Sequence, residues 1–174
     1  MTHLTQDVKP LLKVQQLCIV NETGQALLDD LNFELYPAQT LAMVGESGSG
    51  KSITALALLG LLPETLTGQG VVQFKNDDLL KLNQQQLQQL RGKAIAMIFQ
   101  EPMTALNPLH KVEKIVGENL ILQGLSKAEA QQKVINLLHD VGIEDAQQIL
   151  KCYPHQLSGG QRQRVMIAMA LALE

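Results

Sequence analysis

Short apolar stretches alternate with polar, glycine-containing segments in the first part of the chain. Leu11–Val20 and Leu31–Tyr36 are rich in β-prone residues, and the polar segment between them predicts an antiparallel strand pair. A turn at Thr67–Gly70 and a strand at Val71–Phe74 are expected next. The glutamine-rich segment Gln84–Leu90 predicts a solvent-exposed helix. This region is therefore expected to mix strands with short helices.

Two further apolar segments each end at a polar motif. Thr40–Val44 predicts a strand that runs directly into a glycine-rich segment, and a helix is expected from Lys51 until Gly60. Ala94–Phe99 predicts another compact strand, which delivers Gln100 to its end.

Helical periodicity dominates the rest of the chain. Helices are predicted at Val112–Leu122 and Ser126–Val141, and Ser126 and Glu129 have the spacing of a capping box. A last helix is predicted at Gly159–Glu174, after a glycine pair. The pattern as a whole predicts an α/β fold.

The predicted elements divide the chain into three regions. Residues 1–102 are expected to form a lobe that holds the N-terminal strands and the core strands. Residues 103–158 are expected to form a helical subdomain inserted into that lobe, and residues 159–174 the helix that follows it.

Composition and charge narrow the classes of function. The chain has 174 residues, 45% of them hydrophobic, which suffices for an ordinary globular core. Its 14 basic and 17 acidic residues give a net charge of -3, so no basic excess points to nucleic acid. Cys18 and Cys152 have no metal-ligand spacing. The segment Met1–Pro10 lacks the apolar core of a secretory signal, and the longest apolar runs are too short to cross a bilayer.

A phosphate-binding pattern, Gly-Glu-Ser-Gly-Ser-Gly-Lys-Ser, lies between the strand at 40–44 and the helix that follows. Glycines in such a P-loop let backbone N–H groups surround a phosphate at a helix N-terminus. The lysine reaches the β- and γ-phosphates, and the last hydroxyl ligates Mg²⁺, which assigns magnesium to Ser52. The predicted ATP-binding residues are Gly45, Glu46, Ser47, Gly48, Ser49, Gly50, Lys51 and Ser52.

A second small-residue turn, Leu157-Ser158-Gly159-Gly160-Gln161, precedes the last predicted helix. Its backbone amides and serine hydroxyl offer contacts to another phosphate. Because glycine also opens helices for structural reasons, this pattern gains weight only from its place after a P-loop and a strand that ends in glutamine. The predicted nucleotide-binding residues here are Ser158, Gly159, Gly160 and Gln161.

The P-loop, Gln100 and the segment Leu157–Gln161 occur in the order found in ATP-binding cassette (ABC) transporter ATPases, and the chain resembles that family from about Leu11 onward. Residues 98–108 and 153–156 are similar to the branch that imports dipeptides and oligopeptides, including peptide importers of the microcin C type. The resemblance implies a P-loop NTPase fold with an antiparallel N-terminal region, a parallel core sheet, incomplete here, and an inserted helical subdomain.

The resemblance also implies how the motifs work. Two cassettes would form a head-to-tail dimer, in which the P-loop of one and the signature, residues 157–161, of the other enclose one ATP. Gln100 would contact Mg²⁺ and the attacking water, and its loop would couple the site to transmembrane permease subunits. The implied function is ATP-driven uptake of peptides or related solutes at the cytoplasmic face of the inner membrane, with a periplasmic solute-binding protein as an indirect partner.

The sequence departs from the family pattern in two ways. The Asp and Glu of the family's Walker B strand do not occur before Glu174, so we expect a fragment that is inactive in ATP hydrolysis by itself. Family members also stack adenine on an aromatic side chain near the end of the first strand, but Cys18–Gln25 contains none. We expect Ile19 or Val20 to provide an apolar platform instead.

Two alternative functions remain open at the level of sequence. The chain could belong to a non-transport ABC ATPase that remodels a protein or nucleic-acid partner, or it could be an inactive nucleotide-binding remnant. The importer-like segment Glu101–Pro108 favours transport. His155 lies beside the signature, but the family's catalytic histidine follows a later strand, so His155 is expected to pack or hydrogen-bond there and to take no part in catalysis.

Overall fold

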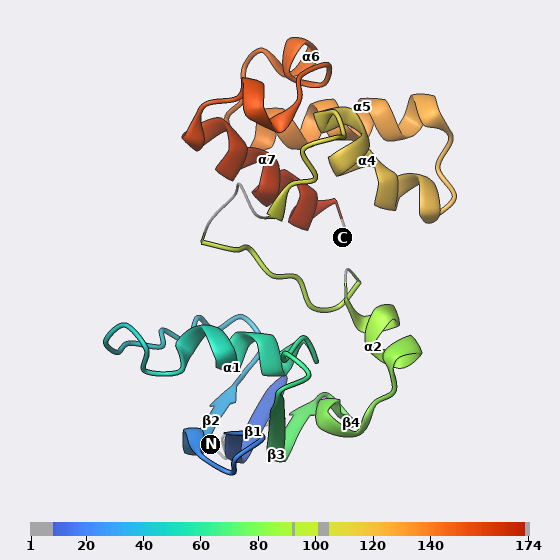
Figure 1. Cartoon of the computed structure of the whole chain (residues 1–174). Coiled ribbons are helices and arrows are strands. Elements are labelled where there is room, and N and C mark those ends of the chain that lie inside the picture. Colours follow the sequence, from blue (N-terminus) through green and yellow to red (C-terminus); the bar gives the residue numbers. More distant parts are fainter. Residues whose placement is uncertain (1–8, 92, 101–104, 173–174) are drawn as a thin grey trace, which may run out of the picture. The chain divides into compact units, whose positions relative to one another are not determined.

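The chain divides into two compact units, Met1–Arg91 and Gly92–Glu174, in the computed structural model (Figure 1). The structure describes residues 9–91, 93–100 and 105–172. The predicted region boundaries at residues 102 and 158 stay predictions. No helix within the described residues combines the length and the apolar character needed to cross a membrane.

Unit 1 is built on a four-stranded antiparallel sheet in the order β2-β1-β3-β4. The strands are β1 (Leu12–Asn21), β2 (Ala26–Leu35), β3 (Leu66–Phe74) and β4 (Asp77–Asp78). The predicted strand pair is confirmed. The turn expected at residues 67–70 is wrong, because these residues pair with β1 as part of β3.

A β-bulge in β1 decides which side chains reach the core of unit 1. The register with β3 shifts between Gln15 and Cys18, and Gln16 has a positive φ of 50°. A Cβ at Gly70 would lie 2.3 Å from the Gln16 carbonyl oxygen, so only glycine fits opposite the bulge. The extra residue moves burial from even to odd positions, so that Val14 and Leu17 are both buried.

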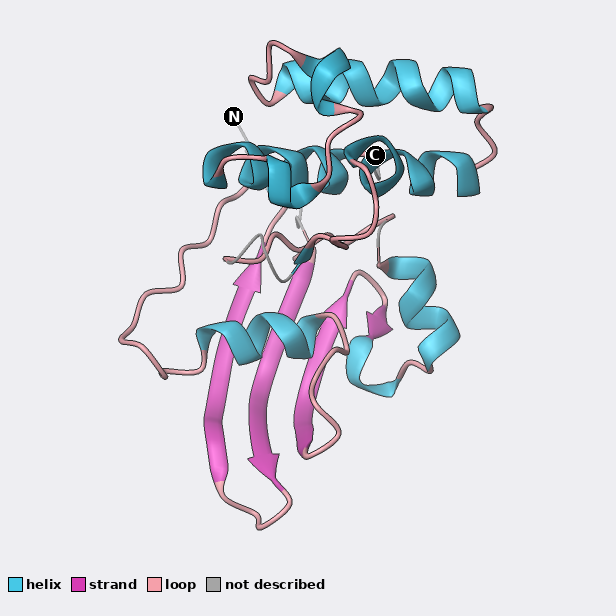
Figure 2. Ribbon diagram, turned by 45° about the horizontal axis from the view of Figure 1, so that its top comes forward, coloured by secondary structure: helices cyan, strands magenta, loops and turns pink. Residues whose placement is uncertain are grey.

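Three short helices lie within residues 9–91, the described part of unit 1. Helix α1 (Lys51–Leu58) crosses one face of the sheet and buries Ala57 (Figure 2). The 3₁₀ helix η1 (Leu79–Lys81) and α2 (Gln84–Leu90) follow β4, and α2 buries Leu87. Both α-helices were predicted from sequence.

Two predicted strands do not form. Neither Thr40–Val44 nor Ala94–Phe99 is a strand, apart from an isolated bridge at Ile95, and Val44 is 92% exposed. A parallel strand needs backbone hydrogen bonds to a neighbouring strand. The sheet of the described residues contains only β1 to β4, and neither segment pairs with it. The α/β class is confirmed, whereas the parallel core strands are a correction to the prediction.

Unit 2 is helical. Its elements are α4 (Val112–Leu122), α5 (Lys127–Asp140), α6 (Ala146–Ile149), the 3₁₀ helix η2 (Pro154–Gln156) and α7 (Gly159–Leu171). Helices α4, α5 and α7 pack against one another around an apolar core. The predicted helices are confirmed, the last one as far as Leu171, with residues 173–174 of that prediction outside the described residues. Helix α6 was not expected. Fully buried core residues include Leu120, Val134, Leu138, Val165 and Met166.

Candidate nucleotide-binding site

The P-loop, residues 45–52, has a backbone that favours glycine at two positions. Gly48 and Gly50 have φ angles of 82° and 90°, in the left-handed region that side chains rarely adopt. A Cβ at Gly45 would lie 2.5 Å from the Ser49 hydroxyl oxygen. The loop closes on itself where the Ser49 N–H donates to the Glu46 carbonyl oxygen at 3.2 Å. The backbone of the loop therefore accounts for Gly48 and Gly50, whereas Gly45 faces only the rotatable Ser49 side chain.

Lys51 lies at the first position of α1 and folds back over the loop. Its Nζ donates to the carbonyl oxygens of Gly45 at 2.8 Å and Glu46 at 2.6 Å, and to the Ser49 hydroxyl oxygen at 3.0 Å. An ammonium group has three donors, and all three bonds end on loop atoms. The positive charge is thus held at the loop, where a phosphate group would be attracted to it.

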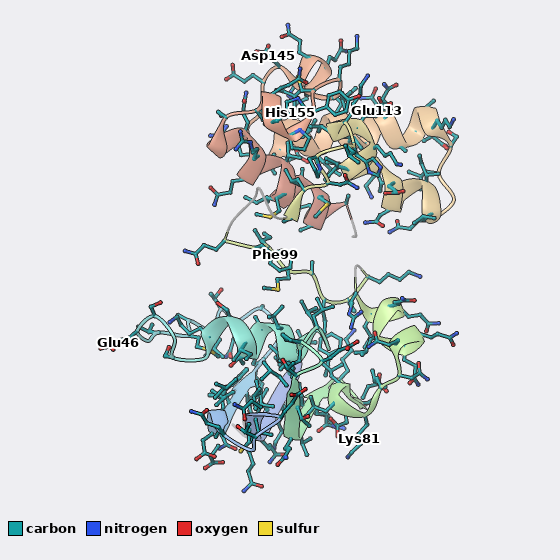
Figure 3. The ribbon with its side chains drawn as sticks, in the orientation of Figure 1. Glu46, Lys81, Phe99, Glu113, Asp145 and His155 are labelled. Carbon is teal, nitrogen blue, oxygen red and sulfur yellow. The ribbon has the colours of Figure 1, made fainter. Side chains whose placement is uncertain are left out.

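The N-terminus of α1 leaves room for an anion. Its N-cap is Gly50, which provides no capping side chain, and the first turn carries no acidic residue. Thr54 is almost fully buried, and its hydroxyl and its N–H both donate to the Gly50 carbonyl oxygen at 2.9 Å. Ser52 is exposed, and Figure 3 places Glu46 at the outer end of the loop. This geometry fits a phosphate on the free amides of the helix.

The signature, residues 157–161, opens α7 in a different way. Ser158 is the N-cap: its hydroxyl oxygen accepts from the Gln161 N–H at 3.2 Å, and its own N–H donates to Gln161 Oε1 at 2.9 Å. A Cβ at Gly159 or Gly160 would meet nothing within 4 Å. Packing within the described residues therefore does not require these two glycines, and they leave the start of α7 bare.

The residues around the signature hold its turn in place. Arg162 Nε donates to the Pro154 carbonyl oxygen at 2.8 Å, and Arg164 donates to the Gly142 carbonyl oxygen. His155 stacks on Tyr153, with ring centroids 5.6 Å apart and planes 10° from parallel. The prediction that His155 packs beside the signature is confirmed.

The predicted site residues lie in both units. The P-loop belongs to unit 1, whereas Gln100 and the signature belong to unit 2. Gln100 is exposed in a bend, and the segment Glu101–Thr104 lies outside the described residues. The two motifs are thus each assembled locally.

The structure distinguishes between the two residues that were expected as a platform for adenine. Ile19 is fully buried on the core face of β1, so it cannot offer an apolar platform to a base. Val20 is half-buried and is the candidate that remains.

Two residues that support the P-loop helix were missed at the level of sequence. Thr54 lies inside an apolar helical run. Its bond to Gly50 could not be predicted, because the sequence shows only a threonine one helical turn after the loop. Arg91 lies 31 and 32 residues from Gly60 and Leu59, and its side chain donates to both carbonyl oxygens. Only the folded chain brings these groups together.

Comparison with known proteins shows that the chain is similar to ATP-binding proteins of transporters. Residues 28–174 match the family described as ABC transporter. The peptidoglycan transport ATP-binding protein YejF of Agrobacterium fabrum is 49% identical over 172 residues, which cover 95% of this chain and 32% of that protein. The oligopeptide transport ATP-binding protein OppD of Salmonella typhimurium is 45% identical over 174 residues, 98% of this chain and 52% of that protein. The chain thus spans between about a third and about a half of these relatives.

The solved structures that match this chain include ATP-binding cassettes as well. The dimeric structure of a post-hydrolysis state of the ATP-binding cassette MJ0796, bound to ADP and Pi, matches with a TM-score of 0.81 at 27% identity. The match covers 92% of this chain and 69% of that one. The cbiO1 protein of Clostridium perfringens, part of the ABC transporter complex cbiONQ, matches with a TM-score of 0.71 at 26% identity over 94% of this chain and 62% of that one. This chain belongs to the ABC transporter family.

Proposed function

We propose that this chain is the ATP-binding part of a motor subunit that drives the import of peptides or related solutes. The observation that carries the proposal is the P-loop itself. Gly48 and Gly50 have positive φ angles that favour glycine, and the N-cap of α1 has no side chain over the helix amides. Its lysine charge is held at the loop by bonds to loop oxygens. These features together form a site for a polyphosphate.

Each P-loop residue has a role in this proposal. Amides of the P-loop that have no partner within the loop would donate to phosphate oxygens, and Lys51 would exchange its carbonyl partners for phosphate charge. Ser52, exposed at the start of α1, would hold Mg²⁺ together with Gln100. Bound ATP supplies the free energy of hydrolysis, and Mg²⁺ neutralises phosphate charge.

A second cassette is part of the proposal because the signature presents an open helix start. Ser158 to Gln161 would cover a nucleotide held by the P-loop of the other cassette. The bare glycines at 159 and 160 support this role, because a phosphate could approach the backbone there without meeting a side chain.

The partners and location of the whole protein follow from this role. Transmembrane permease subunits would receive the motion of the two cassettes at the cytoplasmic face of the inner membrane, and a periplasmic solute-binding protein would deliver the solute to them. Peptides are favoured as the solute because relatives are named as a putative peptide import protein and an oligopeptide transport protein.

An equilibrium titration with Mg-ATP tests nucleotide binding. Lys51→Ala removes the charge at the loop and is expected to weaken binding by about tenfold or more. Lys81→Ala is the matched control, because Lys81 is a surface cation of the same unit whose ion pair with Asp78 does not involve the P-loop. Equal affinities for the original chain and Lys51→Ala would overturn the proposal.

A second experiment tests transport in the source organism. Deletion of the gene is expected to abolish uptake of labelled short peptides, and the gene with an intact P-loop should restore it where Lys51→Ala does not. Unchanged peptide uptake, with a nucleotide-dependent defect elsewhere, would identify a non-transport ATPase instead.

A further inference from the structure

The P-loop helix is too short to be stable by itself. α1 contains 8 residues, fewer than the roughly 12 at which an isolated helix begins to persist in water. Its N-cap glycine adds no side-chain bond, and its last turn carries no basic residue. Its orientation must therefore come from contacts with the rest of unit 1.

The C-terminal end of α1 is closed by a Schellman motif. The N–H of Gly60 donates to the Ala57 carbonyl oxygen at 3.0 Å, and the N–H of Leu61 donates to the Leu56 carbonyl oxygen at 2.8 Å. Gly60 has the positive φ of 60° that this motif requires. The carbonyl groups of Leu59 and Gly60 lie beyond these two bonds and need other partners.

Arg91 binds both of these carbonyl oxygens. Its Nε donates to Leu59 at 2.7 Å and its Nη2 donates to Gly60 at 2.7 Å, so the planar guanidinium acts as a fork. Its positive charge also lies at the negative end of the helix dipole. One side chain thus closes the end of α1 opposite the P-loop.

The two bonds of Arg91 to Leu59 and Gly60, the Arg91 clamp, depend on a side chain that is itself held by α2. The Arg91 N–H donates to the Leu87 carbonyl oxygen at 2.9 Å, and Nη1 lies 3.5 Å from Gln84 Oε1. Leu87 is buried, and its Cδ1 would be 2.6 Å from a Cβ at Gly60. Figure 1 shows α2 in the same unit as α1. Gly60 and Arg91 therefore form one contact between the two helices.

We propose that Arg91 is a positioning residue for the phosphate site. It fixes the far end of a helix about 12 Å long, and the near end of that helix carries the P-loop amides and Lys51. A rigid helix transmits its orientation from one end to the other, so release of the clamp changes where these groups point. The inference rests on the proposed binding of ATP.

The test compares Mg-ATP affinity with stability in the 174-residue chain. Arg91→Ala is expected to weaken Mg-ATP binding about tenfold, and Arg91→Lys, which keeps the charge but loses the fork, should recover part of that loss. Lys81→Ala again serves as the control, and its affinity should stay unchanged. Arg91 variants that unfold more easily but bind Mg-ATP with unchanged affinity when folded would show a purely structural role and overturn the inference.

Hydrogen exchange provides a readout at the helix itself. In Arg91→Lys, the amides of residues 55–58 should exchange faster than in the original chain, while those of α4 should not. If Arg91→Ala does not fold, Arg91→Lys carries the test, and unchanged affinity with unchanged exchange overturns the inference. Failure of Lys51→Ala to affect binding would instead reject the proposed function, whereas an effect of Lys51→Ala without one of Arg91→Lys rejects only the positioning role.

Discussion

The P-loop and the signature look alike in sequence, since both have glycines at the start of a helix. Their glycines have different structural roles. In the P-loop, Gly48 and Gly50 have positive φ angles of 82° and 90°. In the signature, Gly159 and Gly160 are the first two residues of the regular helix α7, and a Cβ on either would meet nothing within 4 Å. Gly48 and Gly50 are needed for the backbone of the loop. Gly159 and Gly160 leave the start of α7 free of side chains.

The two helix starts differ in their caps as well. The N-cap of α1 is a glycine, so the amides of its first turn meet no capping side chain. The N-cap of α7 is Ser158, whose hydroxyl oxygen occupies one amide, that of Gln161. The P-loop is thus open to an anion from its own chain's geometry, while the signature is stable without one. This difference fits the proposal that the two motifs serve different nucleotides.

The largest expected effect concerns Gly50. Gly50→Ala puts a side chain at a φ of 90° and 3.0 Å from Leu28 Cδ1, which costs about 1–2 kcal/mol of stability. Because the distortion lies at the N-cap of α1, Mg-ATP affinity should fall by more than about tenfold. Denaturant unfolding and Mg-ATP titration measure the two effects.

Gly124→Ala is the matched control for this substitution. Gly124 has a φ of 101° in unit 2, and a Cβ there would meet nothing within 4 Å. It should lose similar stability and keep its Mg-ATP affinity. Equal losses of affinity in both variants would mean that the P-loop glycine acts only through general stability.

The features that the sequence predicted correctly are those stabilised by bonds between residues close together in the chain. The Ser126–Glu129 capping box was visible in sequence because its partners lie three residues apart, and the structure forms it. The strand expected at Thr40–Val44 did not form, because apolar character is local but a sheet neighbour is not. The bulge opposite Gly70 and the Arg91 clamp join residues far apart in sequence, so no local pattern indicates them.

The next effect is smaller and lies in the signature. Ser158→Ala removes the hydroxyl that accepts from the Gln161 N–H, and it should lower the free energy of unfolding by about 1 kcal/mol. Ser158→Thr keeps an acceptor and should recover most of the loss. Denaturant unfolding followed by helical circular dichroism measures this. An unchanged midpoint for Ser158→Ala would show that the start of α7 does not depend on its cap.

A substitution at Gly159 tests the other side of the comparison. Because a Cβ there meets nothing within 4 Å and alanine favours helix, Gly159→Ala should raise the free energy of unfolding by about 0.5 kcal/mol. Mg-ATP binding to the chain's own P-loop should stay unchanged. A loss of stability in the same unfolding experiment would mean that the fold itself needs this glycine, and the contrast with Gly50 would fail.

The smallest expected effect is a difference in pH dependence between two capping boxes of unit 2, Ser126–Glu129 and Ser158–Gln161. The N–H and hydroxyl of Ser126 donate to the Glu129 carboxylate at 2.9 and 2.6 Å, and these bonds lower the pKa of Glu129 below its ordinary 4.5. The signature box uses Gln161, which does not titrate.

A lowered pKa means that this stabilisation is present above pH 4.5 and is lost as the pH falls through the folded value. Between about pH 6 and about pH 3, the unfolding midpoint of the original chain should therefore fall slightly more than that of Glu129→Gln. The difference is small because Glu129 is exposed to solvent. Parallel pH profiles for the two chains would show that the Ser126 bonds favour the charged and neutral forms of residue 129 equally. Gln161→Glu, which makes the signature box titratable in turn, should introduce a fall of the same sign.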